Sequence, residues 1–184
     1  MNAKQTISIQ QPKYMTQANG VLNIPVKHQG NTQSSLEEVN VVRELIKELN
    51  TATFTDKAGN NRAVNNSDIL VVAPYNMQVN LLKEKLDSNL QIGTIDKFQG
   101  QEAPVVIVSM AVSDVEDSAR GLDFVFDINR LNVAISRAQA LAIVVANEGL
   151  EGCHVNSLRQ MEKVGFFVKL ETIIMEKDDE RSIT

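Results

Sequence analysis

The stretch Ile69-Leu70-Val71-Val72-Ala73-Pro74 decides the fold of this 184-residue chain. Five apolar residues in a row, closed by a proline, are typical of a strand that is buried on both faces of a parallel sheet. Similar apolar runs occur at residues 105–110 and 141–146, and amphipathic segments separate the three. Because helices connect and cover the strands of a parallel sheet, this alternation predicts an α/β fold with a mainly parallel sheet.

The segments around these runs complete the pattern. Residues 36–49 carry apolar side chains at helical spacing, and Ser35 followed by Glu38 is a capping-box signature for the start of that helix. Residues 51–67 are rich in Thr, Asn, Asp and Gly, which predicts a small exposed hairpin or loop. The remaining elements are expected as strands at residues 21–27 and 91–95 and as helices at residues 77–86, 128–137 and 156–164.

Composition limits what the chain can be. It carries 23 acidic and 18 basic residues, a net charge of −5, so the domain as a whole does not attract nucleic acid and any such contact must be local. The longest apolar stretches fall far short of the roughly 20 residues that a membrane helix needs. Cys153 is the only cysteine, which excludes an internal disulfide and favours a reducing, cytoplasmic setting.

The domain organisation is expected to be simple. Residues 1–20 are mostly polar and predict a flexible lead-in, residues 21–170 one domain, and residues 171–184 a charged tail. Neither His28 nor His154 has a cysteine or acid at metal-ligand spacing, so no metal site is expected.

Two polar signatures stand out against the apolar background. The first is Thr94-Ile95-Asp96-Lys97-Phe98-Gln99-Gly100-Gln101-Glu102, and the second is Asn129-Arg130-Leu131-Asn132-Val133-Ala134-Ile135-Ser136-Arg137-Ala138. Buried polar groups cost free energy unless they are paired, so polar residues kept at such places usually serve a ligand. Since ligands of open parallel sheets bind outside the carboxyl ends of the strands, we expect residues 74–78 and 96–102 to lie there.

Three segments in order, residues 73–79, 93–109 and 129–146, resemble motifs IV, V and VI of superfamily 1 helicases of the Upf-like group. Residues 23–38 also resemble the entry to the second RecA-like domain of those proteins. The resemblance covers about residues 20–170 and is most similar to bacterial proteins in which a RecB-type nuclease is fused to such a helicase. It implies a RecA-like three-layer sandwich of the P-loop NTPase type. It also implies a motor that uses ATP with Mg²⁺ to act on single-stranded nucleic acid, with DNA preferred over RNA.

The resemblance assigns roles in the nucleotide site residue by residue. Arg137 would reach the γ-phosphate of ATP and stabilise the charge that develops on the transferring phosphoryl group, as a permanently charged guanidinium can. Glu102 would contact the ribose. The other implied nucleotide contacts are Gln99 and Gly100, which would line the cleft, and Tyr75 and Gln78 of motif IV, near the base or the phosphates.

Three residues are assigned to the nucleic-acid strand. The hydroxyl of Thr94 would contact a phosphate of the single strand, a role that suits a short neutral donor. Pro74 of motif IV is also assigned to the strand. Lys97, next to Phe98, could neutralise the strand's backbone, whereas Phe98 itself is expected in the core.

Motif IV departs from the family at one position. Some relatives carry an arginine directly after the motif IV glutamine, where this chain has Val79, and Arg130 and Arg43 are the candidate substitutes. Arg130 has a second interpretation. It lies two helical turns from Arg137, and both could pair with acids of residues 113–127.

The phosphate-binding half of an ATP site is absent from these residues. They contain no Gly-rich segment that ends in Gly-Lys-Ser or Gly-Lys-Thr, and no strand that ends in a run of acids suited to Mg²⁺. We therefore expect a C-terminal motor domain that is inactive alone. Its partners would be the first RecA-like domain of the same full-length protein and an upstream nuclease. The alternative is a non-catalytic RecA-like binding or scaffold module.

Overall fold

A five-stranded parallel sheet forms the centre of the molecule. The computed structural model describes residues 5–98, 100–113, 128–148 and 150. The strand order is β2-β8-β7-β5-β6, and every neighbouring pair is parallel. The strands are β2 (Gly20–Val26), β5 (Ile69–Ala73), β6 (Gln91–Thr94), β7 (Ala103–Ser109) and β8 (Ala138–Asn147). The predicted α/β fold with a mainly parallel sheet is thus confirmed.

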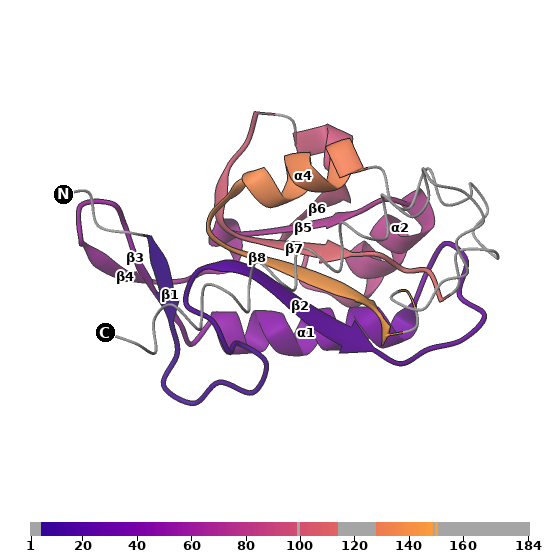
Figure 1. Cartoon of the computed structure of the whole chain (residues 1–184), viewed down its shortest axis with the longest axis horizontal. Coiled ribbons are helices and arrows are strands. Elements are labelled where there is room, and N and C mark those ends of the chain that lie inside the picture. Colours follow the sequence, from indigo (N-terminus) through magenta and orange to yellow (C-terminus); the bar gives the residue numbers. More distant parts are fainter. Residues whose placement is uncertain (1–4, 99, 114–127, 149, 151–184) are drawn as a thin grey trace.

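Helical segments cover both faces of the sheet, which gives three layers (Figure 1). Helices α1 (Leu36–Leu49) and α2 (Asn76–Lys85) pack on one face, where they share a core with alternate residues such as Val105 and Ile107. The 3₁₀ segment η2 (Ile95–Phe98) and helix α4 (Ile128–Ser136) pack on the other face against Val106 and Val108. Because both faces are covered, the strands need apolar residues at consecutive positions, and the arrangement is consistent with a RecA-like P-loop NTPase fold.

Helix α1 begins with only half of the predicted capping box. The Ser35 hydroxyl accepts a hydrogen bond from the backbone N–H of Glu38 at 3.1 Å, as expected. The reciprocal bond is missing, because the Ser35 N–H donates to the Gln78 side-chain oxygen at 2.8 Å instead. The Glu38 carboxylate is therefore available for partners elsewhere in the fold.

A second, antiparallel sheet contains β1 (Thr6–Ser8), β3 (Thr53–Thr55) and β4 (Asn61–Ala63). The hairpin of β3 and β4 confirms the hairpin interpretation of residues 51–67. Strand β1 belongs to the segment that the sequence predicted as a flexible lead-in, yet it pairs with β3, and Ile7 and Met15 of this segment are buried. The carboxylate of Glu48 also accepts hydrogen bonds from the backbone N–H groups of residues 13–15, which holds this polar segment in place.

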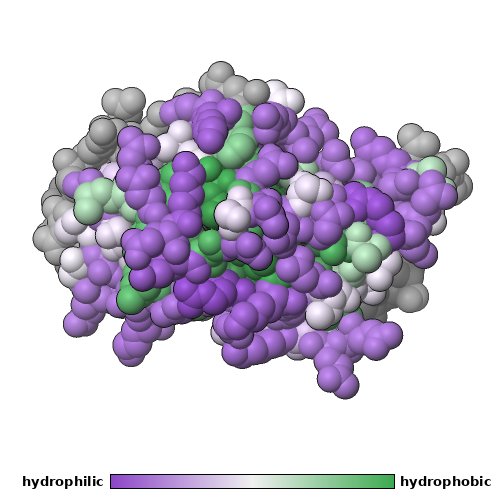
Figure 2. All heavy atoms as spheres, turned by 180° about the vertical axis from the view of Figure 1, so that it is seen from behind, coloured by the Kyte–Doolittle hydropathy of each residue, from purple (hydrophilic) through white to green (hydrophobic). Residues whose placement is uncertain are grey.

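The C-terminal expectations cannot be compared with the structure. The predicted helix at residues 156–164, the domain end at residue 170 and the charged tail all lie outside the described residues. Within the described ranges, no helix is long and apolar enough to cross a membrane. Most of the face shown in Figure 2 is hydrophilic, with apolar atoms visible between the polar side chains.

Asp68, in the 3₁₀ segment η1 (Asn66–Asp68), ties the hairpin to the main sheet. Its carboxylate accepts two hydrogen bonds from Arg62, at 2.6 and 2.7 Å, and one from the Asn65 N–H at 3.0 Å. Burial raises the pKa of Asp68, but the hydrogen bonds from Arg62 and Asn65 outweigh it and hold the pKa below its usual range. Asp68 is therefore ionised in the folded protein at lower pH than in the unfolded chain.

This lowered pKa makes the contribution of Asp68 to stability depend on pH. We expect Asp68→Asn to lower the free energy of unfolding by about 1–2 kcal/mol at pH 7, a modest loss because about half of the Arg62 side chain is exposed. The stabilisation from a depressed folded pKa is fully present above the unfolded pKa of about 3.9 and is lost as the pH falls from there through the lower folded pKa, so the loss caused by Asp68→Asn should shrink over this interval. Urea unfolding at pH 7 and pH 3 measures both values, with Asp87→Asn in an exposed loop as the control. Equal losses at the two pH values would contradict this account.

Candidate functional site

Glu102 and Arg137 lie next to each other at the amino edge of the sheet. Glu102 directly precedes β7 and Arg137 directly precedes β8, at the left of the sheet in Figure 1. The N–H of Ala103 donates to the carbonyl of Arg137 at 3.0 Å, and Ala103 pairs with Ala138 across the two strands. The structure thus brings together two residues that are 35 positions apart in the sequence.

This location corrects one expectation. Residues 96–102 were expected together at the carboxyl ends of the strands, but only their first part lies there. After β6 the chain forms η2 and then crosses the face of the sheet to reach the start of β7, so Glu102 lies at the opposite edge. Any connection between two parallel strands must cross in this way, so the position of Glu102 directly before a predicted strand already indicated the amino edge.

Arg137 has a feature expected of an anion-binding residue. The residue is half-buried, and its Nε is fully buried without a hydrogen-bond partner among the described residues. A buried donor without a partner costs about 1–3 kcal/mol, and a bound ligand is one way in which a functional protein satisfies such a donor. Its backbone is held by the preceding helix, since Leu131 and Ala134 are buried and the Arg137 N–H donates to the Ala134 carbonyl at 3.2 Å.

The turn before β7 is exposed to solvent and lies beside the start of β8. Gly100 has φ of +83°, in the left-handed region that glycine adopts without strain, and both Gly100 and Glu102 are exposed. The predicted nucleotide contact Gln99 lies outside the described residues. Arg130 lies in α4, but its side chain is also outside them.

The predicted strand contacts Thr94 and Pro74 lie at the carboxyl edge. Thr94 ends β6 and is level with Ala73, the last residue of β5, so Pro74 directly follows the partner of Thr94, and both side chains are partly exposed. Val72 of β5 pairs with Val108 of β7. The carboxyl end of β5 is therefore level with Ser109, the last residue of β7. At about 3.3 Å per residue, the edge lies roughly 23 Å along the strands from Glu102. The candidate residues therefore form two separate groups.

Tyr75 and Gln78 belong to the carboxyl edge and not to the group around Arg137. Tyr75 is 3% exposed and packs in the core on the α4 side. Gln78 is 0% exposed, and its amide is hydrogen-bonded to Ser35 and Ser109. The sequence shows that these residues are polar but not that they are buried, and the structure does not bring them to the predicted nucleotide ligands.

Neither Val79 nor Arg43 offers a second phosphate contact in this arrangement. Val79 is 5% exposed. It is a residue of α2 whose side chain packs in the core, where a charged group would be costly. Arg43 donates to the carbonyl of Lys85 at 3.1 Å, at the C-terminal end of α2, where a cation favours the helix dipole. Its observed role is therefore to stabilise that helix end.

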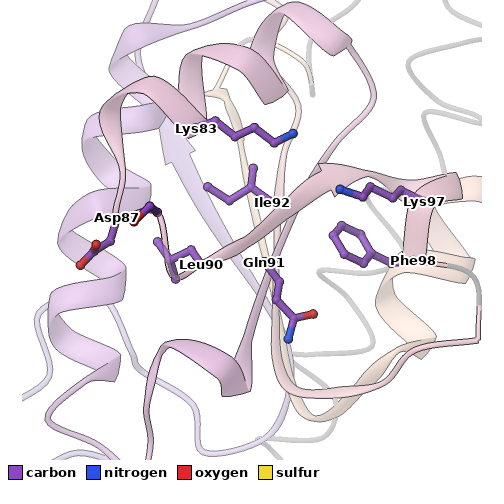
Figure 3. A pocket seen from close by; sticks show the side chains of 8 residues that line it. Lys83, Asp87, Leu90, Gln91, Ile92, Lys97 and Phe98 are labelled. Carbon is purple, nitrogen blue, oxygen red and sulfur yellow. The ribbon is translucent and has the colours of Figure 1, made fainter.

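Lys97 lines a hollow of about 410 Å³ beside the edge strand β6 (Figure 3). Lys83 and Lys97 extend toward the same space, and the Lys97 ammonium lies 5.7 Å from the centre of the Phe98 ring. Gly93 allows η2 to approach this strand, because a Cβ there would lie 2.7 Å from a Phe98 ring carbon. Phe98 is buried, as the sequence predicted. The exposed side chains of Lys83, Lys97 and Asp87 line the hollow.

One buried polar cluster was not expected as such. Glu38, His28, Gln78, Ser109 and Ser35 are all buried, and hydrogen bonds connect them. From the residues alone the sequence indicated Ser35 and Glu38 as a helix cap, and the segments of the resemblance that contain His28 and Ser109 gave neither residue a role. In the described ranges, no group of His, Cys, Asp and Glu could hold a metal ion.

Comparison with known proteins matches residues 3–149 to the model of a family described as "AAA domain". Similar proteins include the DNA replication ATP-dependent helicase/nuclease JHS1 of Arabidopsis thaliana, 29% identical over 112 residues, which cover 60% of this chain and 8% of that protein. RNA helicase Mov10l1 of Homo sapiens is 38% identical over 91 residues, which cover 46% of this chain and 8% of that protein. The uncharacterized ATP-dependent helicase C05C10.2 of Caenorhabditis elegans is 33% identical over 132 residues, which cover 71% of this chain and 7% of that protein. The matched region is thus less than a tenth of each of these relatives.

Proposed function

This chain belongs to the AAA domain family as a superfamily 1 helicase domain of the Upf-like group, and from this we propose that it is the second, C-terminal motor domain of an ATP-dependent helicase or translocase. Its partner would be a first RecA-like domain that supplies the phosphate-binding loop. Closure of the two domains on ATP would move the protein along a single strand.

The observation that carries the proposal is the buried, unpaired Nε of Arg137 beside Glu102. A guanidinium matches the oxygens of a phosphate, and an arginine supplied by a second domain is a recurring part of ATP hydrolysis. In this role Arg137 would contact the γ-phosphate, Glu102 the ribose, and the turn of Gly100 would let the backbone approach the ligand. ATP with Mg²⁺ would supply the transferable phosphoryl group and neutralise part of its charge. The proposed nucleotide site leaves out Tyr75 and Gln78.

The strand would contact the other edge of the sheet. Thr94 and Pro74 are neighbours there and are partly exposed, and Lys97 adds a cation near by. The names of the relatives include both a DNA helicase/nuclease and an RNA helicase. We propose DNA as the strand, together with an upstream nuclease, because of the resemblance to nuclease–helicase fusions. A cytoplasmic setting is proposed from the single cysteine.

Thr94→Val tests the strand contact, since it removes the hydroxyl and keeps the side-chain shape. In a protein with both motor domains, we expect the strand concentration for half-maximal ATPase stimulation to rise about tenfold, because one hydrogen bond to a phosphate is lost. Turnover at saturating strand should stay unchanged. Titration with dT20 and with rU20 measures the effect and compares DNA with RNA.

The matched control is Thr16→Val, at an exposed threonine of residues 5–20. Identical half-maximal concentrations for wild type, Thr94→Val and Thr16→Val would refute the contact.

A further inference from the structure

Glu38 is a fully buried acid in the first turn of α1, far from the group around Arg137. Its carboxylate accepts hydrogen bonds from His28 Nε2 at 3.0 Å, from the Ser109 hydroxyl at 2.6 Å and from the Ala111 N–H at 3.0 Å. A buried carboxylate is costly unless such donors surround it. A structure that supplies three of them, from the chain after β2 and from the end of β7, holds these segments together through one side chain.

Gln78 extends the cluster to helix α2. Its side-chain oxygen accepts from the Ser35 N–H at 2.8 Å, and its Nε2 donates to the Ser35 carbonyl at 3.2 Å and to the Ser109 hydroxyl at 2.8 Å. The Ser109 hydroxyl in turn donates to Glu38. Ser109 is thus the link through which Glu38 and Gln78 act on each other.

The chain that leaves β7 is held in a strained turn. Ala111 has φ of +66°, in the left-handed region that is unfavourable for a residue with a Cβ. Its N–H contacts both oxygens of Glu38, which stabilises this conformation. The turn brings Ser113 to Asn31, where the Ser113 N–H donates to the Asn31 carbonyl at 2.8 Å and its hydroxyl accepts from the Asn31 N–H at 2.9 Å. Strained backbone held by its surroundings often marks a functional position.

The start of α2 depends on the same cluster. Tyr75 precedes the helix, and the amide of Gln78 in its first turn bonds to Ser35 at the start of α1 and to Ser109 at the end of β7. Pro74 lies immediately before this turn, and Thr94 lies beside it on the neighbouring strand. Any rotation of the first turn of α2 would therefore move Pro74 relative to Thr94.

We propose that Glu38 and Gln78 are positioning residues that hold the start of α2 and the chain leaving β7 in one fixed arrangement. Through it they keep the edge with Pro74 and Thr94 preformed for a single strand, and this last step rests on the proposed function. Gln78 accordingly acts from inside the protein and is not a ligand of the nucleotide. The two residues touch neither substrate nor nucleotide.

Hydrogen exchange on the 184-residue chain tests the fixed arrangement without any ligand. Ser109→Ala removes the link while Glu38 keeps His28 and the Ala111 N–H. We expect the amides of Ser35 and of residues 79–82 to exchange about tenfold faster, with the Ala111 amide and the interior of β8 unchanged. A general destabilisation would accelerate all amides together, and this result, or no acceleration at all, would overturn the proposal.

Strand affinity in a protein with both motor domains tests the functional step. Fluorescence anisotropy with labelled dT20 should show about fivefold weaker binding for Gln78→Met and for Ser109→Ala. The double variant should be no weaker than either single variant, because both changes break one network. Ser109→Thr keeps the hydroxyl and should restore binding toward wild type.

The control is Gln91→Met, at an exposed glutamine at the amino end of β6. Unchanged affinity in the single variants, or a double variant whose loss equals the product of the two, would refute the functional step. If the wild-type protein binds no single strand, the proposed function fails, and the exchange experiment alone then decides whether Glu38 and Gln78 fix the edge.

Discussion

Arg137→Ala should lower ATP turnover by a factor on the order of 10³ or more in a protein that contains both motor domains, the range observed for arginines of this role. The loss follows from the removal of a fixed positive charge at the place where charge develops on the phosphoryl group. Arg137→Lys keeps the charge but loses the planar fork, so we expect it to recover only part of the rate. Steady-state ATPase assays at saturating strand measure the effect.

The stability of the same variant separates a ligand contact from a structural role. The Nε of Arg137 is buried and has no partner among the described residues, so its removal takes away an unfavourable group and should not lower the free energy of unfolding. Arg43→Ala, which removes a bond to the carbonyl of Lys85, is the control and should leave turnover unchanged. A large loss of stability with turnover preserved would show that Arg137 is structural.

Glu38→Ala should have the largest effect on stability, a loss of about 3–5 kcal/mol. It leaves the Ser109 hydroxyl, the Ala111 N–H and the His28 ring buried without their shared acceptor. This is a large part of the roughly 5–15 kcal/mol that stabilises a typical domain. Glu38→Gln keeps one acceptor oxygen at the same place and should lose about half as much, which keeps the comparison measurable by urea unfolding.

Glu37→Ala is the matched control for Glu38, because it changes the neighbouring acid on the exposed side of the same helix turn. Its hydrogen bonds to Asn31 and Ser35 are near the surface, so we expect a loss below about 1 kcal/mol. Similar losses for the two alanine variants would contradict the account of a buried anchor.

The sequence predicts most of the central sheet, and the reason is physical. Strands covered on both faces must be apolar at every position, so β5, β7 and β8 are visible as continuous runs. Helix α1 is visible because one stripe of it faces the core. Strand β1 cannot be recognised in the sequence, because it is three residues long, lies within a polar segment and depends on pairing with β3.

The site is less predictable because it depends on long-range pairing. That Glu102 lies beside Arg137 follows from the pairing of Ala103 with Ala138, and no local pattern shows which strands are neighbours. The pattern of Ser35 and Glu38 has a sufficient local explanation as a helix cap, which conceals that the Glu38 carboxylate bonds to the far end of β7. Burial likewise distinguishes Gln78 from the exposed Glu102, although the resemblance implies a nucleotide contact for both polar residues.

ATP turnover with dT20 present, measured for this chain alone and for a protein that joins it to the first motor domain, tests the central claim most directly. We predict no turnover by the chain alone, strand-stimulated turnover by the two-domain protein, and its loss in Arg137→Ala. Turnover by these 184 residues alone, or a two-domain protein that hydrolyses ATP equally well without Arg137, would contradict the assignment of a second motor domain.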